Sequence, residues 1–379
     1  MSKTIIIIGA GLAGLSAALQ AAENGCNVKL VSSLPSERAQ SVMAEGGINA
    51  ALNTKDENDS PEEHFTDTIK AACGLADPNA VWGMTQAAPE LVHWLLKLGV
   101  KFNMSGYDDV DLRNFGGQKK KRTAFAQSDT GKQIMTAMID AVRRKEASGM
   151  VERFSHHSFL TLRLCGNICC GCVIRDEYSQ ETVELPGDAV IVATGGMHGL
   201  FGNTTGSLSN TGEVTAELFR LGVPLANSEM IQYHPTTVKC GGKRMLISEA
   251  ARGEGGRLFA MKDGKQWYFM EEKYPELGNL MPRDITAREI WKVSHESEVF
   301  LDMTEISEEI ISNKLSGLAD DCMTYLHKDI RKEPVSVLPG IHYFMGGILV
   351  DEQHRTPIQN LYAAGECCAQ YHGANRLGG

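Results

Sequence analysis

The feature that most constrains the fold is a glycine-rich turn near the N-terminus. The β-branched run at residues 3–8 is followed by Gly9, Gly11 and Gly14 in a G-x-G-x-x-G spacing, and then by a helical pattern that ends at Gly25. Between a strand and a helix, such glycines permit a tight turn, close approach of a pyrophosphate and close helix–sheet packing. The N-terminus of the helix adds free N–H donors for an anion. The opening therefore predicts an α/β, Rossmann-like domain that binds a dinucleotide.

A second segment predicts that a large cofactor is contacted from two strands. The apolar run at residues 189–193 ends in Thr194 and Gly195, a second junction of strand and glycine. Residues 44–49 form a glycine-containing loop. The acidic residue that usually binds a ribose after the second strand is absent, and Ser32 and Ser33 occupy its place. Their hydroxyls could still bind a ribose.

The rest of the chain divides into helical, β-rich and mixed segments. Helices are expected at 62–72, 80–98 and 130–147, and alternation predicts a small sheet within 150–193. Prolines and short mixed segments from about residue 228 predict an inserted α+β capping domain. We expect the first part of the nucleotide-binding domain at 1–227, the capping domain at 228–340, and an incomplete return segment at 341–379.

Composition excludes several classes of protein. The chain has 47 acidic and 37 basic residues, a net charge of −10, which argues against nucleic-acid binding. No apolar run is long enough for a signal peptide or a membrane span.

Ten cysteines without a secretory signal predict reduced thiols in a cytoplasmic protein. The cysteines at 165–172 fit no common metal spacing, so we expect a hairpin there and no metal site. Residues 119–122 are expected to form a solvated basic loop.

Polar residues suited to chemistry gather in the capping segment and the last forty positions. They include histidines and arginines beside glycines, where a ligand can approach both backbone and guanidinium. The planar fork of arginine binds a carboxylate through two hydrogen bonds, and an anionic substrate needs such local positive charge on an acidic chain. The candidate residues lie in the segments 232–236, 248–256, 282–284, 342–347 and 372–376.

These motifs together resemble a known family over essentially the whole chain. The matching segments are GAGLAG, AEGGINAAL, NFGG, KRTAFA, VATGG, QYHPTT, SEAARGEGGR, PRDITAREI, HYFMGGI, AAGEC and HGANRLGG. The chain resembles the flavoprotein subunits of succinate dehydrogenases and fumarate reductases. The resemblance implies FAD as cofactor and a C4 dicarboxylate as substrate, with fumarate and succinate interconverted by a hydride from flavin N5 and a proton from the protein.

The resemblance also assigns roles to residues. It implies Arg283 as proton donor, with Glu249 and Arg252 as its proton relay. An arginine is an unusual acid because its ordinary pKa exceeds about 12, so His234 is the alternative donor. The implied substrate-binding residues are His234, Ser248, His342, Arg376, Phe115 and Gly47. The residues expected against FAD are Gly9, Gly11, Gly14, Ser32, Ser33, Ser41, Gly46, Gly47, Thr194, Gly195 and Glu366.

Two departures from the family pattern change the expectation. Gln40 stands where many members carry a histidine bonded to the flavin, so FAD should be non-covalent and fumarate reduction favoured. The chain ends at Gly379, before the family's flavin-contacting helix and C-terminal helical domain, so we expect a truncated product or a fragment. The family implies an iron–sulfur subunit, or a soluble electron donor, as partner, and a place in the cytoplasm or peripherally on the inner face of the membrane.

Two alternatives stay open. L-aspartate oxidase also lacks the covalent histidine, but that family has an acidic residue before its Gly-Gly pair, where this chain has Phe115. A non-catalytic flavin-binding or partner-binding remnant is the other alternative.

Overall fold

The computed structural model describes residues 2–379 and places the first strand at the centre of a five-stranded parallel sheet. The order is β20-β10-β1-β2-β6, and every neighbouring pair is parallel. The strands are β1 (Thr4–Ile8), β2 (Asn27–Ser32), β6 (Val151–Ser155), β10 (Ala189–Val192) and β20 (Leu361–Ala363). The predicted α/β class is confirmed.

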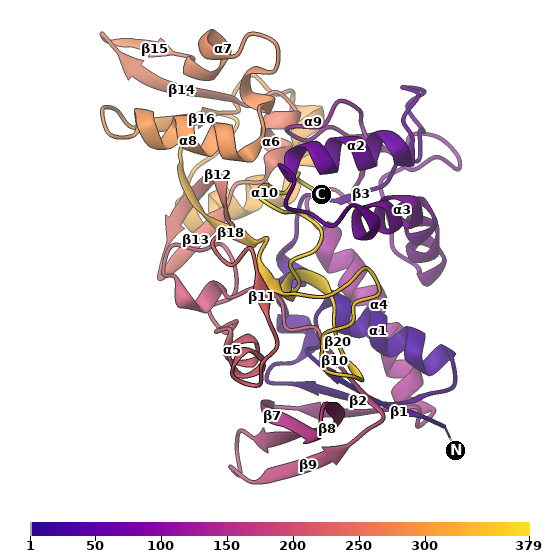
Figure 1. The fold of residues 1–379 in the computed structure, drawn as a ribbon. Coiled ribbons are helices and arrows are strands. Elements are labelled where there is room, and N and C mark those ends of the chain that lie inside the picture. The colour runs from indigo at the N-terminus through magenta and orange to yellow at the C-terminus, as the bar shows by residue number, and fades with distance from the viewer. Residues whose placement is uncertain (1) are drawn as a thin grey trace.

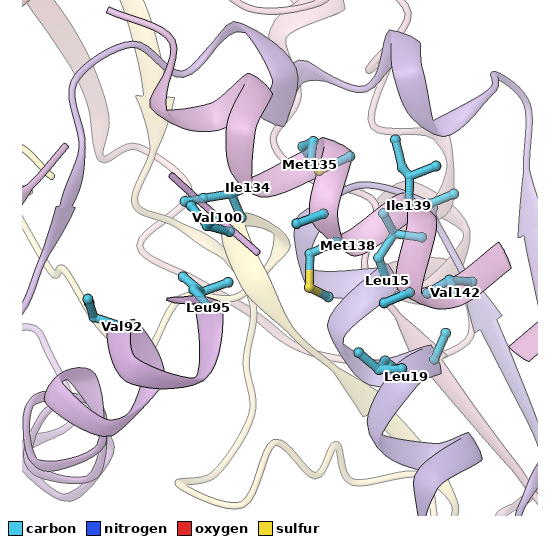
Figure 2. Packing of buried hydrophobic residues seen from close by; sticks show 14 of the residues in the cluster. Leu15, Leu19, Val92, Leu95, Val100, Ile134, Met135, Met138, Ile139 and Val142 are labelled. Atoms are coloured by element: carbon cyan, nitrogen blue, oxygen red, sulfur yellow. The ribbon is translucent and has the colours of Figure 1, made fainter. Parts of the chain in front are cut away.

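Both faces of this sheet are covered, which explains the near-continuous apolar sequence of β1. Ile7 faces a core formed with α1 (Leu12–Glu23) and α4 (Thr130–Ala147), and Figure 2 shows Leu15 of α1 beside Met138 of α4. Ile6 and Ile8 point to the opposite core. A strand buried on both faces has apolar residues at every position rather than at alternate ones.

The opposite core lies against a three-stranded antiparallel sheet of β7 (His157–Cys165), β8 (Ile168–Asp176) and β9 (Thr182–Pro186). The predicted hairpin turn at residues 166–167 joins the first two strands. Cys169 and Cys172 are buried in this core beside Ile6. These two cysteines therefore pack as small apolar residues.

The predicted helices are confirmed within two residues. They are α2 (Pro61–Ala71), α3 (Pro78–Leu98) and α4. The start of α3 is fixed by Asp77, whose carboxylate accepts the N–H of Asn79 at 2.8 Å, and its end by Gly99 with φ 102°. A left-handed residue at a helix end favours glycine.

A third apolar core lies under the elements that run from β12 (Ile231–Cys240) to β18 (Leu338–Phe344). Its sheets are β13-β12-β18 and β15-β14-β16-β17. Figure 1 shows the second sheet, with α7 (Phe269–Lys273) and α8 (Arg283–Val293), at the end of the molecule remote from β7–β9. The predicted domain limits, 228–340, stay a prediction. The strand bounds are β12 (Ile231–Cys240), β13 (Lys243–Leu246), β14 (Arg257–Lys262), β15 (Lys265–Trp267), β16 (Val299–Asp302), β17 (Val335–Ser336) and β18 (Leu338–Phe344).

The remaining elements are short. The helices are α5 (Glu213–Arg220), α6 (Glu249–Gly253), α7 (Phe269–Lys273), α8 (Arg283–Val293), α9 (Glu308–Lys314) and α10 (Ser316–Asp321). The strands are β3 (Ile48–Asn49), β4 (Leu112–Arg113), β5 (Thr123–Ala124), β11 (Leu225–Ala226) and β19 (Gly347–Ile348). Among residues 2–379, no helix combines the length and the apolar character needed to cross a bilayer.

The expectation of a solvated basic loop at residues 119–122 is wrong for its last member. Arg122 is completely buried and pairs with Asp59 at 2.8 Å and Asp67 at 3.0 Å. These two carboxylates compensate the buried guanidinium, which could not otherwise leave water. The basic run therefore ends in a structural ion cluster that anchors the loop to α2.

Candidate active site

One cavity of about 1010 Å³ runs from the carboxyl ends of the parallel strands to the β13-β12-β18 sheet. Ligands of open α/β sheets bind at this edge, beyond the carboxyl ends of the strands. Ten of the eleven residues expected against the cofactor line this cavity, and Gly14 does not. The ten are Gly9, Gly11, Ser32, Ser33, Ser41, Gly46, Gly47, Thr194, Gly195 and Glu366. Five segments far apart in the sequence therefore form one surface of the cavity, which these ten residues define and which is called the cradle below.

Gly14 lies behind the cradle and sets its shape. A Cβ on Gly14 would collide with the carbonyl oxygen of Gly9, and a Cβ on Gly9 with that of Ala193. Gly9 also has φ +111°, a conformation that favours glycine. The first and third glycines of the motif thus allow the turn and the close packing of α1. The second glycine of the motif, Gly11, leaves room for a ligand. A Cβ added there would meet only the side chains of Ser41 and Ala39.

The donors in this cradle fit FAD. The N-cap residue of α1, Gly11, has no side chain to cap the helix, and the N–H of Leu12 donates to Oγ of Ser41 at 3.2 Å. The other N–H groups of the first turn can bind a pyrophosphate. The hydroxyl of Ser32, at the end of β2, is buried without a hydrogen-bond partner. An unpaired buried hydroxyl is costly, and a ribose hydroxyl would satisfy it. These residues would hold the adenosine and pyrophosphate parts of FAD.

The glycine loop at residues 45–47 forms another wall of the cavity and is braced by a buried arginine. The guanidinium of Arg113 donates hydrogen bonds to the carbonyls of Glu45, at 3.2 Å, and Gly46, at 2.9 Å from Nε. It also lies over the ring of Phe125, 4.2 Å from its centroid. The ring of Phe115 packs so closely on Gly46 that a Cβ there would come within 2.9 Å of it. These contacts fix the backbone of residues 45–47 so that it lines the cavity.

Glu366 lines the cavity but is already engaged with the protein. Its Oε1 accepts the N–H of Phe344 at 3.1 Å and lies 3.2 Å from Nε2 of His198. The ring of His198 is buried and reaches Thr204 with its other nitrogen, at 2.9 Å. Sequence reasoning missed His198 because only the fold brings it beside a residue 168 positions away.

Arg283, Glu249 and Arg252 form a continuous buried chain of charges. The Nε of Arg283 donates to Oε2 of Glu249 at 2.8 Å, and Nη2 of Arg252 lies 3.3 Å from Oε1. The N–H of Gly116 donates to the same carboxylate at 2.9 Å. Arg283 and Glu249 line the cavity, whereas Arg252 lies behind them and donates to the carbonyl of Asn279. The structure thus places Glu249 between Arg283 and Arg252, in contact with both.

The electrostatics of this chain follow from burial and from charge pairing. Burial alone would raise the pKa of Glu249, but the guanidiniums of Arg283 and Arg252 more than offset it and hold that pKa below its ordinary value. Burial lowers the pKa of Arg252, partly offset by Glu249. The carboxylate is therefore ionised at neutral pH and shared between two cations.

His234 and His342 stand together on neighbouring strands, with ring centroids 5.0 Å apart. Burial holds the pKa of both far below the usual range, and nearby cations, Arg283 among them, lower it further. Both imidazoles are neutral at pH 7. Nδ1 of His342 lies 2.8 Å from Oγ1 of Thr205, and Nδ1 of His234 lies near main-chain atoms of Thr236. Their Nε2 atoms are left for a ligand.

Ser248 and Arg376 are the other two polar residues expected to bind the substrate. The hydroxyl of Ser248 caps α6 by accepting the N–H of Ala250 at 3.4 Å, so its own proton is free for a ligand. The guanidinium of Arg376 lies over the ring of Tyr343, 4.4 Å from the centroid, and its Nη1 is buried without a partner. Burial, then repulsion from Arg283, lowers the pKa of Arg376 to about 10, so it still carries its charge at neutral pH.

Besides His198, two residues of the site had no role predicted from the sequence. Gln232 accepts a hydrogen bond from Nη1 of Arg283 at 2.9 Å and donates to the carbonyl of Arg376 at 2.5 Å, so it joins the two arginines. Glu45 lies in the glycine loop, and burial, with repulsion from Asp321, raises its pKa to about 8. Both lie inside segments that the sequence analysis singled out, and an acid or amide beside a predicted site residue was the available signal.

The fold and the cradle define a FAD-binding flavoprotein, and comparison with known proteins agrees. A family profile described as FAD binding domain matches residues 4–379. The chain belongs to the succinate dehydrogenase and fumarate reductase flavoprotein family. FAD is therefore its cofactor.

Three relatives illustrate the family. The succinate dehydrogenase flavoprotein subunit of Bacillus subtilis is 44% identical over 99% of this chain and 66% of its own length. The L-aspartate oxidase of Streptomyces coelicolor is 34% identical over 100% of the chain and 65% of its own. A solved structure of E. coli quinol fumarate reductase matches with a TM-score of 0.91 at 30% identity, covering 100% of this chain and 67% of that one. The chain spans about two thirds of the length of such relatives.

Proposed function

We propose that this chain carries the catalytic site that interconverts fumarate and succinate, with Arg283 as proton donor. The observation that carries the proposal is the shared cavity: Arg283, His234, His342, Ser248 and Arg376 line the same space as the dinucleotide cradle. Relatives named succinate dehydrogenase and fumarate reductase support the reaction class.

Four side chains from separate segments would bind the two carboxylates of the substrate. Arg376 offers a charged fork with an unpaired Nη1, and the neutral rings of His234 and His342 offer Nε2–H donors. Ser248 adds a hydroxyl proton. Donors on both carboxylates hold the dicarboxylate in one orientation and withdraw electrons from its double bond. The walls formed by Phe115 and Gly47 limit how the ligand can lie.

When bound, FAD supplies the hydride, and the protein must supply a proton to the neighbouring carbon. Arg283 lines the cavity with Nη2 outside the hydrogen bonds that occupy its Nε and Nη1. Glu249 and Arg252 form the route by which a proton returns to it. His234 is the weaker candidate acid, because burial keeps its ring neutral at pH 7.

We further propose that FAD is held without a covalent bond and that fumarate reduction is the favoured direction. Gln40 lines the cavity and has no nucleophilic ring nitrogen to bond the flavin. An iron–sulfur subunit, or a soluble donor, would deliver electrons, and the protein would be peripheral on the cytoplasmic face of a membrane. Names of relatives, such as the subunits of quinol-linked enzymes, support this kind of partner.

A redox cycle of the purified protein tests the proposal. Protein loaded with FAD is bleached with dithionite, freed of reductant, and mixed anaerobically with fumarate. Re-oxidation by fumarate, with succinate formed, supports the proposal. A bound flavin that fumarate does not re-oxidise would favour the non-catalytic remnant.

L-aspartate is the second substrate to test, because aspartate oxidases are among the relatives. Phe115 precedes Gly116 in the sequence and lines the cavity. Aspartate oxidases are expected to carry an acidic residue at this position, whose carboxylate would bind the ammonium group of the substrate. We therefore expect flavin reduction by succinate or re-oxidation by fumarate, and no flavin reduction by L-aspartate.

A further inference from the structure

Arg244 is a cation beside the cavity that the proposed reaction does not use. It lies on β13 and lines both the large cavity and a smaller one of about 290 Å³. The other residues of the smaller cavity are Trp291, Ser294, His295, Leu338 and Pro339, none of them acidic. Arg244 therefore stands where the outer space meets the proposed substrate site.

The position of Arg244 follows from a glycine on the neighbouring strand. A Cβ on Gly340 would come within 2.5 Å of Cδ of Arg244 and 3.2 Å of its Nε, so the stem of the arginine lies against bare backbone. Gly340 is the register partner of His234 on β12, and it precedes His342 by two residues on β18. The main-chain N–H of Arg244 donates to the carbonyl of Thr204, next to the residue that contacts His342.

The guanidinium has no charge partner of its own. Its Nε is buried without a hydrogen-bond partner, and Arg244 makes no ion pair anywhere in the described chain. Burial lowers its pKa, and no carboxylate offsets that effect. A protein of net charge −10 repels a dianion at long range, so an unpaired cation at the cavity raises the local concentration of anionic ligands.

We propose that Arg244 is an outer binding residue that captures the incoming dicarboxylate and delivers it to the site at His234, His342 and Arg376. This inference rests on the proposed function, since it names a step of ligand entry to that same site. Arg244 is a positioning residue and takes no part in the chemistry.

The test compares succinate association with FAD-loaded protein, followed by stopped-flow from the change in flavin absorbance. We expect Arg244→Gln to slow association roughly tenfold at low ionic strength, with the gap closing at high salt, where the attraction is screened. Arg244→Lys should keep most of the rate. Gly340→Ala, which keeps the charge but displaces the stem, should slow association as well. The matched control is Lys239→Gln, which removes a positive charge from an exposed residue directly opposite Arg244 in the same hairpin and outside the cavity.

Each outcome decides the question. If Arg244→Gln and Lys239→Gln slow association equally, or if the effect of Arg244→Gln does not change with salt, the entry role is wrong while the proposed function stands. If the parent protein binds no succinate at any salt concentration, the proposed function fails and the entry role fails with it.

Discussion

Replacing Glu249 by glutamine should destabilise the protein strongly, because this carboxylate is the shared partner of two buried cations. Glu249 is 2% exposed and contacts Nε of Arg283 at 2.8 Å and Nη2 of Arg252 at 3.3 Å. One lost charge-assisted hydrogen bond costs about 1.5–3 kcal/mol. Leaving buried charges without their partner brings the usual total to about 3–5 kcal/mol. We expect a loss in that range for Glu249→Gln.

The matched control is Glu271→Gln. Glu271 also pairs with an arginine, Arg257, through two hydrogen bonds of 2.9 and 2.7 Å, but both side chains are about one-third exposed, at 37% and 35%. Water and ions screen such a pair, so its loss should cost about 1 kcal/mol or less. Both variants carry the same chemical change, which isolates the effect of burial.

The free energy of unfolding of the parent and both variants is measured by urea unfolding, at low and high salt and over a pH series that extends into acid. Because pairing keeps the pKa of Glu249 below its ordinary value of 4.5, its stabilisation is present above that pH and is lost as the pH falls through the lowered pKa. The parent and Glu249→Gln should therefore converge in acid. A cost for Glu249→Gln no larger than that for Glu271→Gln would refute the account of the buried charge chain.

Three further results are expected. Arg376→Lys keeps the charge but loses the planar fork, so succinate affinity measured by calorimetry should fall by roughly one to two orders of magnitude; an unchanged affinity would remove Arg376 from the substrate site. Burial lowers the pKa of His64 to about 4, so between about pH 6.5 and 4 only the unfolded chain takes up a proton at this residue. The free energy of unfolding should therefore fall by roughly 3 kcal/mol as the pH is lowered through that window. His64→Gln should flatten this pH dependence, and an unaltered slope would contradict the assignment. Because Gln40 cannot bond the flavin, acid precipitation should release all of it, and fluorescence that stays with the denatured chain would contradict this.

Local sequence patterns were sufficient for the elements that hold the cofactor. The strand–glycine–helix opening, the three long helices and the second glycine junction at residues 194–195 each depend on residues close in sequence. Their physical causes are local as well: an Asp cap, a left-handed glycine, and an apolar run buried on both faces. This is why their limits could be predicted within a few residues.

Contacts between distant segments could not be read from the sequence. Arg122 was expected in solvent, but its partners Asp59 and Asp67 come from more than fifty residues earlier in the chain. In the same way, Gln232 joins Arg283 to Arg376 only because β12 passes between their segments. A pattern identifies a polar residue, whereas only the fold supplies the partner that determines its burial and charge.

A single-turnover experiment with Arg283→Gln tests the central claim most directly. FAD-loaded protein, reduced and mixed with fumarate, is followed by flavin absorbance, while succinate binding is measured on the oxidised form. If Arg283 donates the proton, the variant should retain succinate binding and reduction by dithionite, while re-oxidation by fumarate should nearly cease, because the carbon next to the hydride acceptor would stay unprotonated. Re-oxidation of Arg283→Gln at a rate near that of the parent would contradict the account and make His234 the leading candidate for the proton donor.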